Sequence, residues 1–193
     1  VIGFQSLSNN IDGHSNVANG YQSLKSNVTG TQNTANGYRS LYDNSGGSFN
    51  TANGFQSLKS NTTGYNNTAN GNNALMNNIG GVSNTALGYQ SGTNNTTSNY
   101  NTFVGSNSNL NSNSDTWEYS TALGYNAKIT ASNQIVLGRT AETVEIPGNL
   151  NVDGSLNITN ASTMGSTLYV NDTLTVSNAS ILSSTLDVTG AST

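Results

Sequence analysis

Hydrophobic and polar positions repeat every 17 residues over the first part of the chain. In most units an alanine lies two positions before a glycine, an aromatic residue directly follows that glycine, and a leucine comes four positions after it. The repeated glycines are Gly3, Gly20, Gly37, Gly54, Gly71, Gly88 and Gly105, followed after 19 and 14 residues by Gly124 and Gly138. Such regular spacing predicts a stack of equivalent coils.

The repeated unit predicts an all-β fold. Its consensus N-T-A-N-G-Y-Q-S-L alternates small and larger side chains with period two, which is typical of a strand. The Asn- and Gly-rich stretch after the leucine predicts a turn. We therefore expect each coil to hold two short strands and two turns, with coils about 4.8 Å apart. Equivalent positions would then form ladders of leucine, aromatic and asparagine side chains along the stack.

The composition supports a fold that does not depend on a large apolar core. Only 33% of the residues are hydrophobic and 7% are charged, and the net charge is −4. Backbone and asparagine hydrogen bonds between coils are therefore expected to order the chain. No apolar run is long enough to span a bilayer, so no membrane insertion is expected. The five basic residues are far apart in the sequence, and nucleic-acid binding is not expected either.

A glycine in every coil suggests a place where another chain approaches closely. The alanine two positions earlier is expected on the same face, because strand side chains alternate. Together they predict a smooth surface through which three copies of the chain associate. The predicted trimer contacts are Gly20, Gly37, Gly54, Gly71 and Gly88 with Ala18, Ala35, Ala52, Ala69 and Ala86.

Three segments resemble the head repeats of trimeric autotransporter adhesins: S-N-T-A-L-G-Y-Q-S at 83–91, S-T-A-L-G-Y-N-A at 120–127 and N-Q-I-V-L-G at 133–138. Related repeats occur in long fibres of phages and large viruses. The resemblance covers residues 1–147 and implies a left-handed parallel β-roll in which three chains lie side by side. In that family an aliphatic residue before the glycine faces the coil interior. This chain has Asn19, Asn36, Asn53 and Asn70 there. Either these coils contain an internal asparagine ladder, or the sides of the coil that face inward and outward differ from those of the family.

The pattern changes after Pro147, the only proline in the chain. Short Leu-x-Val and Leu-x-Ile segments follow, separated by Asp, Gly, Asn and Ser, with a repeat of 18 residues. Such segments cannot bury their apolar side alone. We therefore expect a head of 17-residue repeats at 1–147 and a thin, triple-stranded β-helical shaft at 148–193.

Few residues suggest chemistry. His14 is the only histidine and has no partner for catalysis, and Asp115 and Glu118 are an acidic pair only three residues apart. We expect no enzyme activity, no metal site and no cofactor. The insert at 106–119 contains the only tryptophan, and Trp117 and Tyr119 are candidate ligand contacts because exposed loops and aromatic residues favour binding. The alternative is that Trp117 covers an edge of the stack or a subunit seam.

Several Asn-x-Ser/Thr sequences would accept glycans if the host glycosylates the chain. The predicted acceptors are Asn27, Asn61, Asn66, Asn94, Asn157 and Asn171.

Together these features predict a trimeric structural or attachment fibre, extracellular and projecting from a virion, phage tail or cell surface. Its partners would be its own copies and a host-surface glycan or receptor bound through avidity. A bacterial surface adhesin or filament subunit is an alternative. An ice-binding solenoid ranks lower, and rests on the threonines at 34, 51, 68, 85, 102 and 121, which could order water if they lie on a flat outer face.

Overall fold

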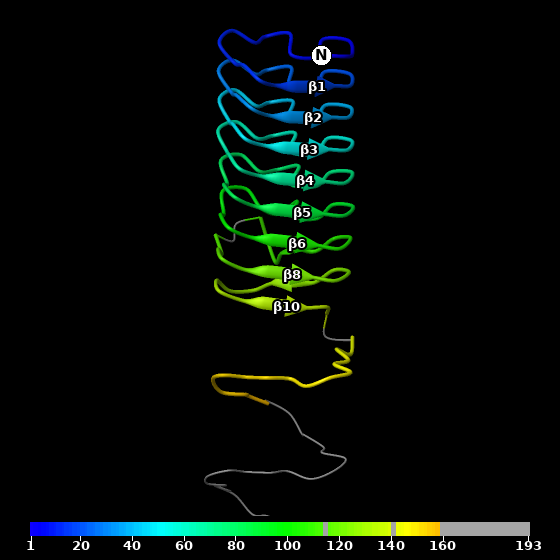
Figure 1. Ribbon diagram of the computed structural model, residues 1–193, viewed down its shortest axis with the longest axis vertical. Coiled ribbons are helices and arrows are strands. Elements are labelled where there is room, and N and C mark those ends of the chain that lie inside the picture. Colours follow the sequence, from blue (N-terminus) through cyan, green and yellow to red (C-terminus); the bar gives the residue numbers. More distant parts are fainter. Residues whose placement is uncertain (114–115, 140–141, 159–193) are drawn as a thin grey trace, which may run out of the picture. The chain divides into compact units, whose positions relative to one another are not determined.

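The computed structural model describes residues 1–113, 116–139 and 142–158. The chain divides into two units, Val1–Ile146 and Pro147–Thr193. The first unit is a parallel β-solenoid, called the stack below, in which one coil lies directly on the next (Figure 1). The described residues contain no helix. The predicted all-β solenoid of 17-residue coils is thus confirmed.

Each coil contributes one short strand to a parallel sheet of eight strands. The strands in sheet order are β1 (Val17–Asn19), β2 (Thr34–Asn36), β3 (Thr51–Asn53), β4 (Thr68–Asn70), β5 (Thr85–Leu87), β6 (Thr102–Val104), β8 (Thr121–Leu123) and β10 (Ile135–Leu137). Repeat-equivalent residues face each other in register, as Ala35 and Ala52 do. A second sheet contains only β7 (Asn109–Leu110) and β9 (Lys128–Ile129).

The expected second strand is absent from the 17-residue coils that the structure describes. The segment after each glycine forms a turn, because alternate residues have positive φ: 133° at Gly37, 52° at Arg39 and 49° at Leu41. Non-glycine residues in this region cost about 1–2 kcal/mol each. Hydrogen bonds between coils offset the cost, for example from Leu41 N to the Ser57 carbonyl at 3.0 Å.

A narrow hydrophobic core runs along the inside of the stack. Alanines from the strands face leucines from the opposite turns, and both sets are fully buried. The predicted leucine ladder is therefore confirmed for Leu24, Leu41, Leu58 and Leu75. In one coil the small and the large core residue exchange places: Gly92 is at the leucine position and Phe103 is at the alanine position. A Cβ on Gly92 would lie 2.8 Å from the Phe103 ring, so the ring fills the space that leucine occupies elsewhere.

Two asparagine ladders run through the rest of the interior. In the first, each side-chain amide donates to the asparagine of the preceding coil, as Asn44 Nδ2 does to Asn27 Oδ1 at 2.8 Å. In the second, each side-chain oxygen accepts the backbone N–H of the next equivalent asparagine, as Asn33 Oδ1 does from Asn50 N at 3.0 Å. The first ladder contains Asn10, Asn27, Asn44, Asn61, Asn78 and Asn95, and the second Asn16, Asn33, Asn50, Asn67, Asn84 and Asn101.

Both ladders converge on one backbone carbonyl in each coil. The Gly47 carbonyl accepts from Asn44 Nδ2 at 2.9 Å and from Asn33 Nδ2 at 2.8 Å. A side chain on Gly47 would overlap the amides of Asn44 and Asn61 and the Gly64 carbonyl, which explains the second repeated glycine. Asn95 Oδ1, at the last position of the first ladder, has no hydrogen-bond partner among the described residues. The other buried amides of the two ladders are paired, so this polar interior largely avoids the usual cost of unsatisfied groups.

The second unit is described only as far as residue 158. Leu150, Val152, Leu156 and Ile158 are all exposed there, and residues 142–158 contain no regular secondary structure. The remainder of the predicted shaft lies outside the described residues.

Candidate interaction surface

The eight-stranded sheet presents one regular outer surface, here called the sheet face. In the strands of the stack the middle residue points inward, while the first and third point outward. The first positions are mostly threonine, so the threonine ladder lies on the outside of the stack. Thr68 and Thr85 are exposed, and Thr34, Thr51, Thr102 and Thr121 are half-buried.

The third strand position, directly before the repeated glycine, also faces outward. Asn19 and Asn70 are exposed there, and Asn36 donates through Nδ2 to Asn53 Oδ1 at 2.8 Å along the surface. The aliphatic residues that follow them in later coils point outward as well. The adhesin resemblance implied that the residue before the glycine faces the coil interior, and this expectation is wrong for this chain. The internal asparagine ladders are formed by other residues.

The alanines predicted as trimer contacts lie inside the stack. Ala18, Ala35, Ala52, Ala69 and Ala86 are at most 1% exposed. Their side chains pack against the leucine ladder and cannot touch another chain. The prediction placed them outside because period-two alternation defines two sides of a strand without saying which side is enclosed.

The repeated glycines have an explanation within the chain itself. Gly54 has φ of 136°, and a Cβ there would overlap the backbone carbonyl of Gly71 in the next coil. The same holds for Gly20 and Gly37, each against the glycine one coil further on. The glycine ladder is therefore required for one coil to stack on another, and its predicted role in trimer contact stays a prediction.

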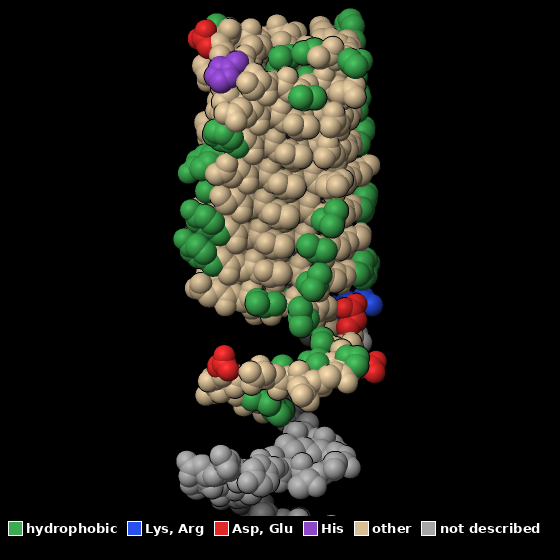
Figure 2. Space-filling model, viewed as in Figure 1, with side chains coloured by type: hydrophobic (Ala, Val, Ile, Leu, Met, Phe, Trp, Pro, Cys, Tyr) green, Lys and Arg blue, Asp and Glu red, His purple; other side chains and the backbone are tan. Residues whose placement is uncertain are grey.

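The sheet face is polar in its first half and apolar in its second. Asn70 pairs in register with Leu87, and the following third positions are Val104, Leu123 and Leu137. We call these four aliphatic residues the apolar stripe. Leu87, Leu123 and Leu137 each expose 45–48% of their surface. None of the outward residues of the eight-stranded sheet is charged, and few charged side chains are visible on the stack from this side (Figure 2).

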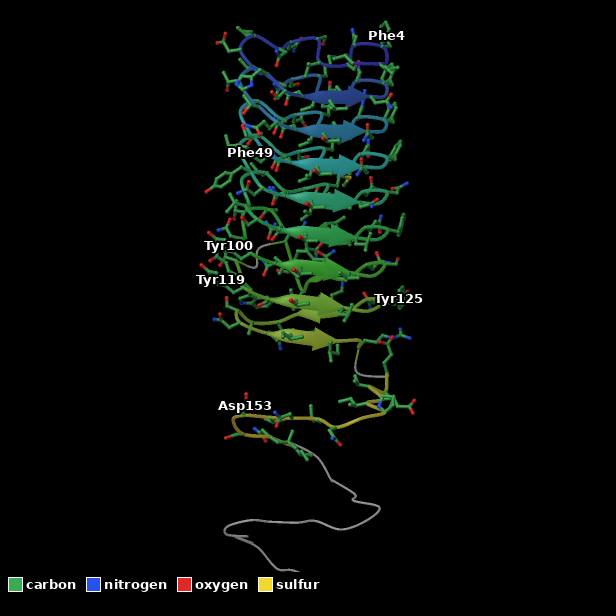
Figure 3. All side chains as sticks on the ribbon, in the orientation of Figure 1. Phe4, Phe49, Tyr100, Tyr119, Tyr125 and Asp153 are labelled. Carbon is green, nitrogen blue, oxygen red and sulfur yellow. The ribbon has the colours of Figure 1, made fainter. Side chains whose placement is uncertain are left out.

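Rows of aromatic side chains run along the two sides of the sheet, beside the two ends of its strands. Phe4 and Tyr125 lie at one edge, and Phe49, Tyr100 and Tyr119 lie at the other (Figure 3). The first row confirms the predicted aromatic ladder: ring centroids are 5.6, 5.3 and 5.1 Å apart in the series Phe4, Tyr21, Tyr38, Phe55. Such stacked rings cover one another's faces, so only their edges remain accessible.

The two ligand-contact candidates in the insert have different environments. Trp117 is half-buried and packs against the hydrophobic core, and its backbone carbonyl accepts from Asn101 Nδ2 at 2.7 Å. Tyr119 is 58% exposed and stacks on Tyr100 with ring centroids 4.7 Å apart. Trp117 thus helps to close the stack where the repeat changes, whereas Tyr119 is available to a ligand at its edge.

Burial separates the predicted glycan acceptors. Asn27 and Asn61 are completely buried members of the first asparagine ladder, so the folded stack has no room for a glycan on them. Asn66 is exposed, whereas Asn94 is half-buried and donates through Nδ2 to the Leu110 carbonyl. Asn157 is exposed in the second unit, and Asn171 lies outside the described residues.

A cavity of about 520 Å³ opens at the last coil, lined by Asn126, Lys128, Thr130, Val136, Leu137, Gly138 and Arg139. Lys128 donates to the Asn107 carbonyl at 2.9 Å, and burial lowers the pKa of its ammonium group. Arg139 lies over Tyr125 and forms an ion pair with Glu142 at 3.2 Å. Since Glu142 offsets one of the two positive charges, the cavity has little net attraction for an anion.

Residues that could suggest metal or acid–base chemistry are far apart in the described ranges. No group of three or more His, Asp or Glu side chains that could hold a metal ion is present among them. His14 is exposed, with Nδ1 3.3 Å from Ser15 Oγ, and Glu118 accepts from Asn99 Nδ2. Asp115 lies outside the described residues. The residues that the structure describes contain no helix long and apolar enough to cross a membrane.

Comparison with known proteins found no match to this chain among protein-family models, curated proteins or solved structures.

Proposed function

We propose that this chain is one protomer of a homotrimeric fibre with a structural or attachment role on an extracellular surface such as a virion, phage tail or cell. The apolar stripe is the observation that carries the proposal. Four aliphatic side chains in vertical register on a flat, uncharged sheet are an unusual surface for a chain that stays alone. We propose that the stripe packs against its counterparts in the other two copies.

Identical parallel chains around a common axis bring equivalent residues to the same height. A charged ladder on the contacting face would therefore bring like charges together and oppose association. The outward residues of the eight-stranded sheet avoid this, because they are Thr, Asn, Val, Leu and Ile only. The exposed Leu150, Val152, Leu156 and Ile158 in the second unit are further apolar residues that partner copies could cover.

The solenoid also fits a mechanical role. Every coil is hydrogen-bonded to its neighbours around its perimeter, and two buried asparagine ladders add side-chain bonds along the axis. Such a rod would hold weakly binding surfaces away from the particle or cell, and three copies would raise the avidity of each contact.

Light scattering on residues 1–193 tests the assembly. We expect about three times the chain mass of 20.0 kDa. The combined variant Leu87→Asn, Val104→Asn and Leu123→Asn should give the single-chain mass with unchanged circular dichroism, because earlier coils already have asparagine at this position. Ile79→Asn is the matched control, since Ile79 is also 48% exposed but lies outside the strands.

A folded single chain of the unaltered protein would contradict the proposal. Assembly that persists in the triple variant would show that another surface holds the copies together.

The outward threonine ladder favours one second candidate, an ice-binding solenoid. Regularly spaced hydroxyl groups on a flat sheet can each donate and accept hydrogen bonds with ordered water. A trimer that buries the sheet face would cover these hydroxyls, so the two functions compete for one surface. Thermal hysteresis measured on a single-chain species would favour the second candidate, and its absence would dismiss it.

A further inference from the structure

Three of the five basic residues of the chain meet at one corner of the stack, although they are far apart in the sequence. Lys25, Tyr42 and Lys59 occupy the same position of three successive coils. Backbone hydrogen bonds join these coils here, from Ser26 N to the Tyr42 carbonyl and from Asp43 N to the Lys59 carbonyl. The stack therefore forms a column in which a tyrosine lies between two lysines.

Arg39 joins this column from the side. Its guanidinium lies 5.1 Å from the centre of the Tyr42 ring and 5.3 Å from that of Tyr38, and its Nε donates to Gln22 Oε1 at 2.8 Å. Lys25 Nζ is 5.6 Å from the Tyr42 ring. Cation–π contacts of this kind hold the positive groups near the ring without neutralising them. We call Lys25, Arg39, Tyr42 and Lys59 the basic–aromatic corner.

No carboxylate neutralises the corner. Asp43 is the only acidic residue between residues 20 and 70, and it makes no ion pair with Lys25, Arg39 or Lys59. Within the described ranges, the one ion pair is that of Arg139 and Glu142 at the other end of the stack. Three cations and one carboxylate leave the corner positive on a chain whose net charge is −4.

The spacing of the cations indicates what the corner binds. Coils lie about 4.7–4.9 Å apart, so the two lysines are about 9–10 Å apart along the stack axis. An extended polysaccharide with one acidic group on every second sugar presents anions at wide intervals of this kind. Duplex DNA instead presents a charge about every 1.7 Å and needs many cations for tight binding.

The corner is also too short for a densely charged partner. The equivalent positions above and below it are Ser8, Met76 and Thr93, so the basic column ends after three coils. Membrane surfaces attract clusters of about four to eight basic residues, more than the three found here. Aromatic residues and polar groups such as the half-buried Gln56 are suited to sugar hydroxyls.

We infer that the basic–aromatic corner binds an acidic polysaccharide, carboxylated or sulfated, and this inference rests on the attachment role proposed above. Lys25 and Lys59 contact two successive acidic groups of the polysaccharide. Arg39 and the Tyr42 hydroxyl donate hydrogen bonds to the sugar between them.

Binding of the intact chain to immobilised oligosaccharides tests the inference. Hyaluronan oligosaccharides supply carboxylates alone, heparin oligosaccharides supply sulfates as well, and dextran is the neutral control. We expect binding to at least one acidic oligosaccharide and none to dextran. The double variant Lys25→Gln and Lys59→Gln should weaken this binding at least about tenfold, since neither acidic group would then contact a lysine ammonium.

Arg139→Gln is the matched control, because it removes one positive charge at the far end of the stack and should change the affinity less than about twofold. Thermal unfolding followed by circular dichroism verifies that each variant is folded. An equal loss in the control, no binding to either acidic oligosaccharide, or stronger binding to single-stranded DNA or phosphatidylserine vesicles would overturn the inference.

Light scattering on the same samples separates this inference from the proposed function. A trimer that binds no acidic oligosaccharide contradicts only the inference about the corner. A single chain that binds acidic oligosaccharides and loses that binding in the double variant contradicts only the trimeric fibre.

Discussion

At the residue scale, backbone conformation explains the most regular feature of the sequence. The glycine of each 17-residue unit has a φ that other residues rarely adopt, and its missing side chain leaves room for the carbonyl of the next coil. Leucine and glutamine also adopt positive φ in the same turns, with φ of 49° at Leu58 and 54° at Gln56. Stacking must therefore offset a recurrent local cost in every coil.

Replacing Gly54 with alanine tests this explanation. Alanine would have to adopt φ near 136° there, and its Cβ would overlap the Gly71 carbonyl. We therefore expect the free energy of unfolding to fall by on the order of 3 kcal/mol. Gly46→Ala is the control, because Gly46 lies outside the positive-φ region and its nearest neighbour is Thr29 Oγ1 at 3.4 Å. Denaturant unfolding measures both, and equal effects would contradict the explanation.

At the element scale, ladders rather than strands hold the stack together. No described strand has more than three residues, whereas the two asparagine ladders and the leucine ladder run through successive coils. Asn61 shows how the first ladder works: it donates to Asn44 Oδ1 and to the Gly64 carbonyl, and it accepts from Asn78 Nδ2. A buried amide in this position is useful only because both neighbouring coils have one too.

Asn61→Ala should therefore lower the free energy of unfolding by about 2–4 kcal/mol. Asn44 Oδ1 would be left buried without a donor, and each unpaired buried group costs about 1–3 kcal/mol. Asn70→Ala provides the comparison, because Asn70 is exposed on the sheet face and its side chain makes no hydrogen bond within the described residues. If both substitutions had the same small effect in thermal unfolding, the buried ladder would not contribute to stability.

At the scale of the whole molecule, the stack is nearly one-dimensional, since each coil contacts mainly the coils before and after it. Such an architecture can lose a complete unit without losing its fold. The coil that contains Gly92 and Phe103 shows that individual units even tolerate an exchange of core volumes, provided the total is kept.

Deleting residues 55–71 removes one complete repeat and should leave a folded stack. The deletion joins Gly54 to Asn72, which preserves both asparagine ladders and lowers the thermal midpoint only slightly. Deleting residues 55–70 removes one residue fewer and shifts the register, and a one-residue slip turns inward residues outward. We expect a much lower midpoint for this second deletion. Equal midpoints would show that coil register does not govern stability.

Sequence periodicity was sufficient for the features that depend on equivalent positions alone. The number of residues in a coil, the buried leucine ladder and the stacked aromatic row all follow from spacing. The apolar stripe could also have been suspected, because Leu87 and Leu123 replace the asparagine of earlier units. The interior location of Ala35 could not, since a strand pattern defines two sides and does not say which one is enclosed.

The sequence by itself determined the repeat, and the repeat determined a parallel stack, because equal spacing lets every coil make the same hydrogen bonds with the next. Only the tertiary structure decided which side of each strand became the interior. Alanine fills this position in most coils, and the much larger Phe103 fits because Gly92 makes room for its ring. Closure of the coils also decided that Lys25, Arg39 and Lys59 meet at one corner, since residues so far apart in the chain become neighbours only when successive coils stack.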